Sequence, residues 1–212
     1  MRPHDMLRLV GGAELRYEGV VPAWVPASLA RAPWVVVRRA RTPDGLIPVG
    51  VRGRARGERF AALLAMDAVA ARVTPEGLAA ARSWRHIPCG RQVGSLRVLD
   101  TVDELFISLG LVWGPTGSVG FELATGVAAA SAASDLDVVV RAPELWPLER
   151  AREVAEALAP LPVRVDAQLD TPAGAVTLAE YARGGHVLVR APDGPRLTRD
   201  PWRETTIDPR SA

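Results

Sequence analysis

Residues 113–120 read Trp-Gly-Pro-Thr-Gly-Ser-Val-Gly, and residues 134–140 read Ser-Asp-Leu-Asp-Val-Val-Val. The first segment follows an apolar run and precedes a candidate helix, so it predicts a strand, a glycine-rich turn and a helix start. The second segment predicts a strand that begins with two acidic residues, Asp135 and Asp137. Because side chains alternate along a strand, we expect both carboxylates on the same side.

Two neighbouring carboxylates favour a bound cation. Like charges repel each other, and Mg²⁺ takes oxygen ligands, commonly a few carboxylates together with phosphate oxygens and water. We therefore expect Asp135 and Asp137 to bind Mg²⁺, with Mn²⁺ as an alternative, next to a phosphate-bearing substrate. An isolated Asp-x-Asp pair is more often a turn cap or an exposed strand edge. The glycine-rich turn before it favours the catalytic interpretation.

That turn has the properties of a phosphate site. Free backbone N–H groups at a helix start attract phosphate, Gly117 permits close approach of the backbone, and Ser118 adds a hydroxyl donor. Thr116 is a further candidate phosphate ligand, although an N-cap role is the more ordinary explanation. Arg141, shortly after the acidic pair, is a candidate phosphate contact because its planar guanidinium suits phosphate oxygens.

A third carboxylate is expected on a later strand. Asp166 lies in the alternating run Val163–Gln168 and is the preferred candidate, with Asp170 as the alternative. Both acids share one face of that predicted strand, so a polar, solvent-facing role is the simpler reading for either. The three histidines show no metal-ligand spacing to one another.

A glycine-serine turn, a helix and an Asp-x-Asp strand in this order resemble the DNA polymerase beta-type nucleotidyltransferases. Longer strings narrow the likeness. Residues 113–126 followed by 134–137 are similar to the phosphoribosyl-dephospho-CoA transferases of malonate decarboxylase, also called holo-acyl-carrier-protein synthases. Residues 2–5, 31–39 and 163–182 resemble that family as well, so the likeness covers essentially the whole chain.

The resemblance implies a reaction and its participants. In that family, a serine of the decarboxylase's acyl-carrier protein receives a phosphoribosyl-dephospho-CoA group from triphosphoribosyl-dephospho-CoA, and diphosphate leaves. It also implies that Asp135, Asp137 and Asp166 are the catalytic and metal-binding acids, and that Gly117 and Ser118 hold the phosphates. Two alternatives stay open: a nucleotidyltransferase that uses ATP or CTP on another hydroxyl acceptor, and a catalytically inactive protein that only binds a partner.

The expected fold class is α+β. A small N-terminal mixed α/β domain (1–92), Arg-rich and a candidate docking surface for carrier or substrate, should precede a nucleotidyltransferase-like catalytic domain (93–212) with a mixed sheet flanked by helices. The patterns predict strands at 34–37, 46–51, 134–140, 162–169 and 186–190, helices from 75 and at 96–109, 119–124, 144–159 and 177–183, a partly helical 59–73, and an irregular tail after Pro192.

Composition describes an ordinary folded chain of 212 residues, 48% hydrophobic and 24% charged. All of its 26 basic residues apart from histidine are arginine, and they concentrate between Arg38 and Arg59, which suits a polyanion or an acidic protein. The single cysteine, Cys89, excludes an intramolecular disulfide and fits a reducing compartment. No apolar run approaches a membrane span. We therefore expect a cytoplasmic protein without membrane or nucleic-acid partners.

Overall fold

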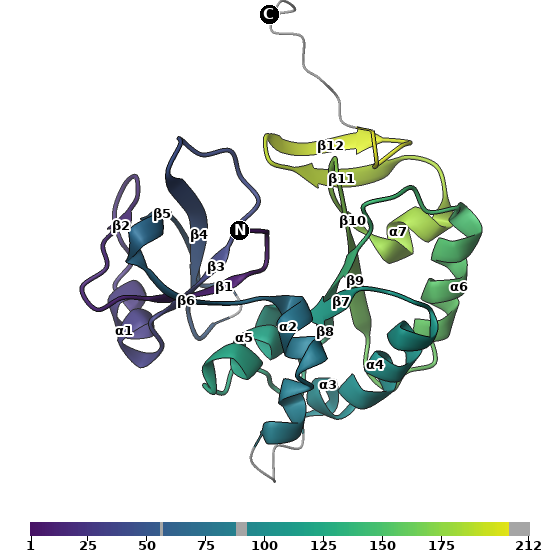
Figure 1. The fold of residues 1–212 in the computed structure, drawn as a ribbon, viewed down its shortest axis with the longest axis horizontal. Helices are drawn as coiled ribbons and strands as arrows, with labels where there is room; N and C mark the ends of the chain where they lie inside the picture. Colours follow the sequence, from purple (N-terminus) through teal and green to yellow (C-terminus); the bar gives the residue numbers. More distant parts are fainter. Residues whose placement is uncertain (56, 88–92, 204–212) are drawn as a thin grey trace, which may run out of the picture.

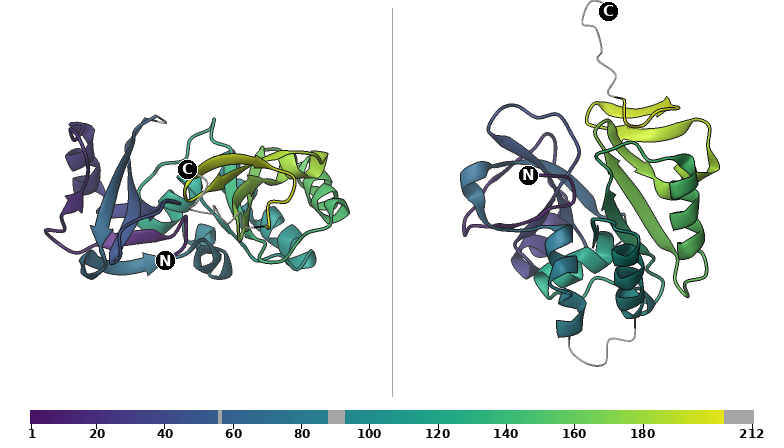
Figure 2. Two further views of the ribbon diagram at one scale, coloured as in Figure 1. Left: turned by 90° about the horizontal axis from the view of Figure 1, so that it is seen from above. Right: turned by 45° about the vertical axis from the view of Figure 1, so that its right-hand side comes forward.

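The computed structural model describes residues 1–55, 57–87 and 93–203. Two lobes lie side by side, each built around its own six-stranded sheet (Figures 1 and 2). The predicted α+β class, with a mixed sheet flanked by helices in the second half, is confirmed. Within these ranges, none of the helices is long and apolar enough to cross a bilayer.

The N-terminal lobe is an antiparallel sheet with strand order β2-β5-β4-β3-β1-β6. The predicted hairpin at 34–51 is present, and its turn uses Gly45 at a φ of 78°. One helix packs against β4. The elements are β1 (Met6–Leu9), β2 (Leu15–Arg16), α1 (Trp24–Arg31), β3 (Trp34–Val37), β4 (Leu46–Arg52), β5 (Arg59–Ala65), η1 (Met66–Ala68) and β6 (Val69–Val73).

The C-terminal lobe contains a mixed sheet with strand order β12-β11-β10-β9-β8-β7, in which only β8 and β9 run parallel among the described strands. A parallel pair needs a long crossover, and helix α6 supplies it. The elements are α2 (Pro75–Ala80), η2 (Ser83–His86), α3 (Gly94–Arg97), α4 (Leu99–Ser108), β7 (Trp113–Pro115), α5 (Gly117–Thr125), β8 (Leu136–Arg141), α6 (Leu148–Leu158), β9 (Val165–Thr171), β10 (Gly174–Thr177), α7 (Leu178–Arg183), β11 (Val187–Ala191) and β12 (Gly194–Thr198).

Two sequence predictions were wrong. Residues 59–65 and 69–73 are strands, and only the short 3-10 helix η1 between them is helical. β5 pairs with β4 along its whole length, and this tertiary pairing overrides the helix propensity of Ala and Leu. The tail after Pro192 is not irregular either, since β12 pairs with β11. Pro195 is tolerated there because β12 is an edge strand.

The connection between the lobes runs through α2. Thr74 caps this helix by accepting a hydrogen bond from the Gly77 N–H at 3.0 Å. The predicted domain boundary after residue 92 and the thiol of Cys89 fall outside the described residues. Ala79 and Trp84, which precede that boundary, pack in the core of the C-terminal lobe.

Apolar and ionic contacts join the two lobes. Phe121 of α5 packs with Met6 and Ala32 of the N-terminal lobe, and all three side chains are buried. Arg39, just after β3, forms an ion pair with Asp170 of β9. These contacts hold the N-terminal lobe against α5 and against the C-terminal end of β9.

Candidate active site

The glycine-rich turn and the acidic strand meet in space. Strands β7 and β8 are antiparallel neighbours, and the Thr116 N–H donates to the carbonyl oxygen of Asp137 at 2.8 Å. Gly117 follows at a φ of 59° and begins α5. A Cβ atom on Gly117 would overlap the Asp137 carboxylate. The carboxylate therefore faces the turn, and only glycine leaves room for it.

Asp166 is the cross-strand neighbour of Asp137. The two are register partners in the parallel pair β8–β9. Burial, followed by the negative charges of Asp166 and Asp135, raises the pKa of Asp137, while Arg52 and Arg59 act in the opposite direction. The three predicted acids thus interact electrostatically near the N-terminal ends of β8 and β9. A bound cation would relieve their mutual repulsion.

The chemistry of these donors fits a divalent cation that also binds its substrate. Among the described residues, however, no group of three or more His, Cys, Asp or Glu is gathered closely enough to hold a metal ion by itself. Mg²⁺ commonly uses one or two carboxylates and completes its shell with substrate phosphates and water. The carboxylates present suit that kind of site rather than a closed protein cage.

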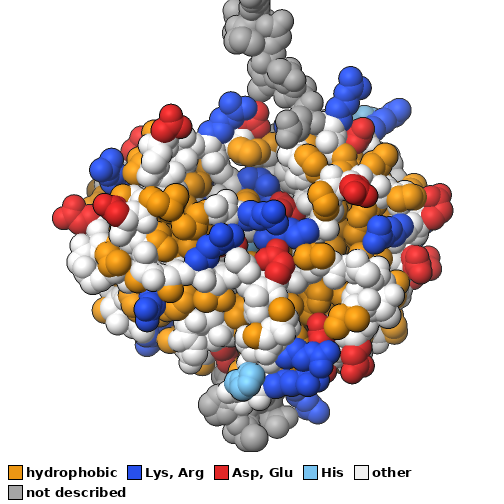
Figure 3. All heavy atoms as spheres, in the orientation of Figure 1, with side chains coloured by type: hydrophobic (Ala, Val, Ile, Leu, Met, Phe, Trp, Pro, Cys, Tyr) orange, Lys and Arg blue, Asp and Glu red, His pale blue; other side chains and the backbone are white. Residues whose placement is uncertain are grey.

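A cleft of about 580 Å³ separates the lobes and has Asp137 in its wall. This volume lies in the range of about 300–1,000 Å³ typical of ligand pockets. Arginines line it heavily, and Figure 3 shows basic side chains gathered between the lobes, all of them arginine because the chain has no lysine. The polar and charged side chains lining the cleft are His4, Arg38, Arg39, Arg52, Arg59, Thr116, Asp137, Gln168 and Arg190.

Arg52 and Arg59 come from the N-terminal lobe. They are register partners at the end of the β4–β5 ladder, so they occupy neighbouring positions on two strands. Both lower the pKa of Asp137, which means that their positive charges act on the carboxylate across the cleft. The cleft therefore combines an acidic wall from one lobe with a basic wall from the other, an arrangement suited to a metal-bound polyphosphate.

The predicted site residues do not all reach this cleft. Of the residues predicted and described, Thr116, Gly117 and Asp137 line it, but Ser118, Asp135, Asp166 and Arg141 do not. Ser118 is 7% exposed, in the first turn of α5. Asp166 shares the β9 face of Gln168, a residue that does line the cleft, and it also borders a separate hollow beside α6 and α7.

Arg141 and Asp170 belong to a buried ion-pair network. Arg141 is 7% exposed, donates to Asp170 at 2.6 Å and also pairs with Glu76 of α2. Asp170 additionally pairs with Arg39. Asp170 is thus already neutralised by two guanidinium groups, whereas Asp166 lies beside another carboxylate. Of the two candidate third acids, Asp166 is the one placed next to Asp137.

His4, one of the three histidines without metal-ligand spacing, lies beside this network. Burial, then the charges of Arg39 and Arg141, lowers the pKa of His4 to about 4. The imidazole is therefore neutral near neutral pH. His4 adopts a φ of 75° inside a turn in which the Arg2 N–H donates to the Asp5 carboxylate at 2.8 Å. This turn places the N-terminus at the edge of the cleft.

Sequence reasoning did not rank the cleft arginines. Arg52 and Arg59 were two members of a long basic stretch, and Arg190 and Gln168 were not singled out. Arg52 and Arg59 could have been singled out only by predicting that residues 46–52 and 59–65 form a hairpin, because the two arginines are register partners in it. Residues 59–73 were instead expected to be partly helical.

The fold and the cleft define an α+β protein with two lobes, whose shared cleft places the Asp137 carboxylate opposite arginines of the other lobe. The sequence comparisons narrow this class. The family described as "Phosphoribosyl-dephospho-CoA transferase MdcG C-terminal domain" matches residues 78–201, and "Phosphoribosyl-dephospho-CoA transferase MdcG N-terminal domain" matches residues 2–75. The chain belongs to the phosphoribosyl-dephospho-CoA transferase family.

Curated relatives match nearly the whole chain. A phosphoribosyl-dephospho-CoA transferase of Azotobacter vinelandii is 43% identical over 96% of this chain and 95% of the relative. Proteins of the same name from Pseudomonas aeruginosa and Pseudomonas fluorescens are 40% and 42% identical, over 97% and 94% of this chain and 96% and 93% of their own lengths. No solved structure matches. The predicted family resemblance is confirmed.

Proposed function

We propose that this protein transfers phosphoribosyl-dephospho-CoA from triphosphoribosyl-dephospho-CoA to a serine of the malonate decarboxylase acyl-carrier protein, with release of diphosphate. The observation that carries this proposal is the contact between the Asp137 carboxylate and the Gly117 turn inside an arginine-lined cleft. Membership of a transferase family supplies the substrate class. The reaction belongs in the cytoplasm, where the carrier protein would be made.

The reaction is an in-line displacement at the innermost phosphorus of the triphosphate. The carrier serine oxygen forms a new bond to this phosphorus, the bond to the bridging oxygen breaks, and diphosphate leaves on the opposite side. The serine proton passes to a carboxylate, for which Asp166 is our candidate because it lies beside Asp137. Bonds and charges balance without any further reactant.

The residues around the cleft would position the triphosphate. The free N–H groups at the start of α5 and the Thr116 hydroxyl would hold its outer phosphates, together with the buried Ser118 if that side chain becomes accessible. Arg52 and Arg59 would neutralise the charge that develops on the departing diphosphate. Asp135, Asp137 and Asp166 would bind Mg²⁺, which would lower the pKa of the serine hydroxyl and shield the phosphate charge.

A direct experiment is mass measurement of the carrier. Purified protein, Mg²⁺, the apo carrier subunit and triphosphoribosyl-dephospho-CoA are incubated together, and the intact carrier is weighed. We expect a mass increase equal to one phosphoribosyl-dephospho-CoA group. The increase should disappear when the carrier serine is replaced by alanine and when the enzyme carries Asp137→Asn.

Two rival functions predict different outcomes of the same assay. A nucleotidyltransferase using ATP or CTP would leave the carrier unmodified and transfer labelled nucleotide to another hydroxyl acceptor. An inactive binding protein would bind the carrier without modifying it, and Asp137→Asn would then change nothing. Asp137, the Gly117 turn and the arginines are present in one cleft, and Asp135 and Asp166 act electrostatically on Asp137, which favours a catalyst over an inactive protein.

A further inference from the structure

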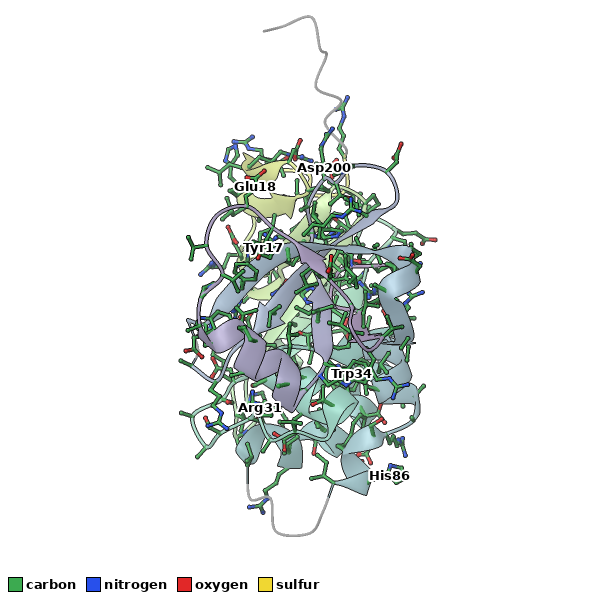
Figure 4. The ribbon with its side chains drawn as sticks, turned by 90° about the vertical axis from the view of Figure 1, so that its left-hand side faces the viewer. Tyr17, Glu18, Arg31, Trp34, His86 and Asp200 are labelled. Atoms are coloured by element: carbon green, nitrogen blue, oxygen red, sulfur yellow. The ribbon has the colours of Figure 1, made fainter. Side chains whose placement is uncertain are left out.

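A second, smaller hollow opens next to the cleft. Its volume is about 270 Å³, and it lies between the two lobes. The N-terminal lobe contributes the end of α1 and the end of β4 with the residues that follow it, and the C-terminal lobe contributes α5 and the loop after it. Figure 4 labels Arg31 at the end of α1. The lining residues are Arg31, Arg52, Gly53, Arg54, Phe121, Ala128, Ala129 and Ala130.

The lining of this hollow carries an excess of positive charge. Three of its lining residues are arginines, and none of the described residues that line it is acidic. The described part of the chain offers the Arg31, Arg52 and Arg54 guanidinium groups no hydrogen bond or ion pair, in contrast to Arg39 and Arg141. The carboxylate of Glu58, which lies nearby, accepts a hydrogen bond from the backbone N–H of Ala55 at an N–O distance of 2.9 Å. Clustered guanidinium groups without counter-charges favour an anionic ligand.

The hollow adjoins the cleft. Arg52 and Phe121 line both spaces, so Arg52 stands between the acidic site at Asp137 and the second hollow. The opposite wall is held in place, because the N–H groups of Ala129 and Ala130 each donate to the buried Glu122 carboxylate at 2.9 Å. A ligand with two phosphate groups separated by sugars could therefore occupy both spaces at once.

We propose that the hollow lined by Arg31, Arg52 and Arg54 binds the internal diphosphate of the dephospho-CoA part of the donor. This inference rests on the proposed function, in which the triphosphate end of the donor lies at Asp137. Dephospho-CoA carries a diphosphate between adenosine and its pantetheine arm, so the complete donor has two separate phosphate groups. The hollow is recessed between the lobes, which suits a small-molecule group better than the surface of an acidic protein.

Binding measurements with two partial ligands test the assignment. Dephospho-CoA contains the internal diphosphate and lacks the triphosphate. Inorganic triphosphate, added with Mg²⁺, represents the triphosphate and lacks the dephospho-CoA part. The test variant is Arg31→Gln with Arg54→Gln, which removes two charges and keeps most of each stem. Arg183→Gln, an exposed arginine of α7 outside both spaces, is the matched control. Affinities are measured by calorimetry on the full-length protein, with thermal unfolding as the check on folding.

The double variant should bind dephospho-CoA at least about tenfold more weakly than the wild type, because two charge-assisted contacts are lost. Its affinity for inorganic triphosphate should stay within about twofold, and Arg183→Gln should change neither. Unchanged dephospho-CoA affinity in the folded double variant would overturn the proposal, and so would an equal loss for both ligands. A double variant that keeps its affinity for dephospho-CoA and loses affinity for the apo carrier protein in calorimetry would overturn the proposal and identify a carrier-docking surface instead. These readouts need no transfer activity, so they remain separate from the mass assay of the proposed function.

Discussion

The Asp137 carboxylate lies against the Cα of Gly117, so close that any side chain at position 117 would overlap it. Gly117 also has a φ of 59°, in the left-handed region that disfavours other residues. One glycine thus joins the turn at the start of α5 to the carboxylate on β8. Both the predicted phosphate site and the predicted metal site depend on this contact.

Gly117→Ala should abolish most of the activity. The new methyl group would displace the Asp137 carboxylate, and a displacement of about 1 Å in an active site can cost about 100-fold in rate. Gly126→Ala is the matched control, since Gly126 ends the same helix at a φ of 72° with open space around it. Both variants should lose about 1–2 kcal/mol of stability from backbone strain. Equal activity of the two variants in the carrier-modification assay would show that the contact with Asp137 is unimportant.

Asp166→Asn should reduce activity, whereas Asp170→Asn should reduce stability. Asp166 lies beside Asp137, so its amide should reduce kcat by at least about 100-fold and leave the melting temperature close to that of the wild type. Asp170 pairs with Arg39 and Arg141, and its amide should reduce the free energy of unfolding by about 3–5 kcal/mol because two largely buried guanidinium groups lose their counter-charge. Thermal unfolding and single-turnover kinetics distinguish the two outcomes. If only Asp166→Asn lost stability, Asp166 would be the structural acid and Asp170 would become the candidate for the third acid of the site.

Mg²⁺ should stabilise the wild type and leave Asp137→Asn unaffected. A ligand at one hundred times its Kd adds about 2.7 kcal/mol to the folded state, which thermal unfolding detects readily. Without Mg²⁺, Asp137→Asn should be at least as stable as the wild type near neutral pH, because burial and the charges of Asp166 and Asp135 disfavour the ionised carboxyl. Asp67→Asn, at an exposed acid in η1, is the control. A Mg²⁺-induced shift of equal size in Asp137→Asn would remove this carboxylate from the metal site.

The pH dependence of stability should contain a contribution from His4. Its pKa is lowered from 6.5 to about 4, so the unfolded chain binds this proton more tightly than the folded protein. The contribution is complete above about pH 6.5 and is lost as the pH falls toward 4, up to about 3 kcal/mol in total. His4→Asn, which tolerates the positive φ, should reduce the difference in urea midpoint between about pH 7 and pH 4.5. His86→Asn, at an exposed histidine, should leave that difference unchanged.

Local sequence signals predicted most of the second lobe, including its glycine-rich turn. The glycine-rich segment, the Asp-x-Asp strand, the helix start at residue 75 and the helix at 177–183 follow from spacing and turn chemistry, which are properties of neighbouring residues. The helix predicted over 96–109 is divided at Val98 into α3 and α4. Family resemblance, carried by long strings around residues 113–137, was also readable without coordinates.

Long-range pairing was decided by the tertiary structure alone. The sequence could not separate Asp166 from Asp170, because both share a face of β9; the register of β8 against β9 and the two arginines around Asp170 distinguish them. It predicted Arg141 as a phosphate contact, whereas the folded protein surrounds that guanidinium with Glu76 and Asp170. Arg52 and Arg59 reach the cleft only because β5 is a strand paired with β4, which helix propensity did not predict. Each case depends on residues distant in the chain, whose contacts and burial arise only when both lobes pack together.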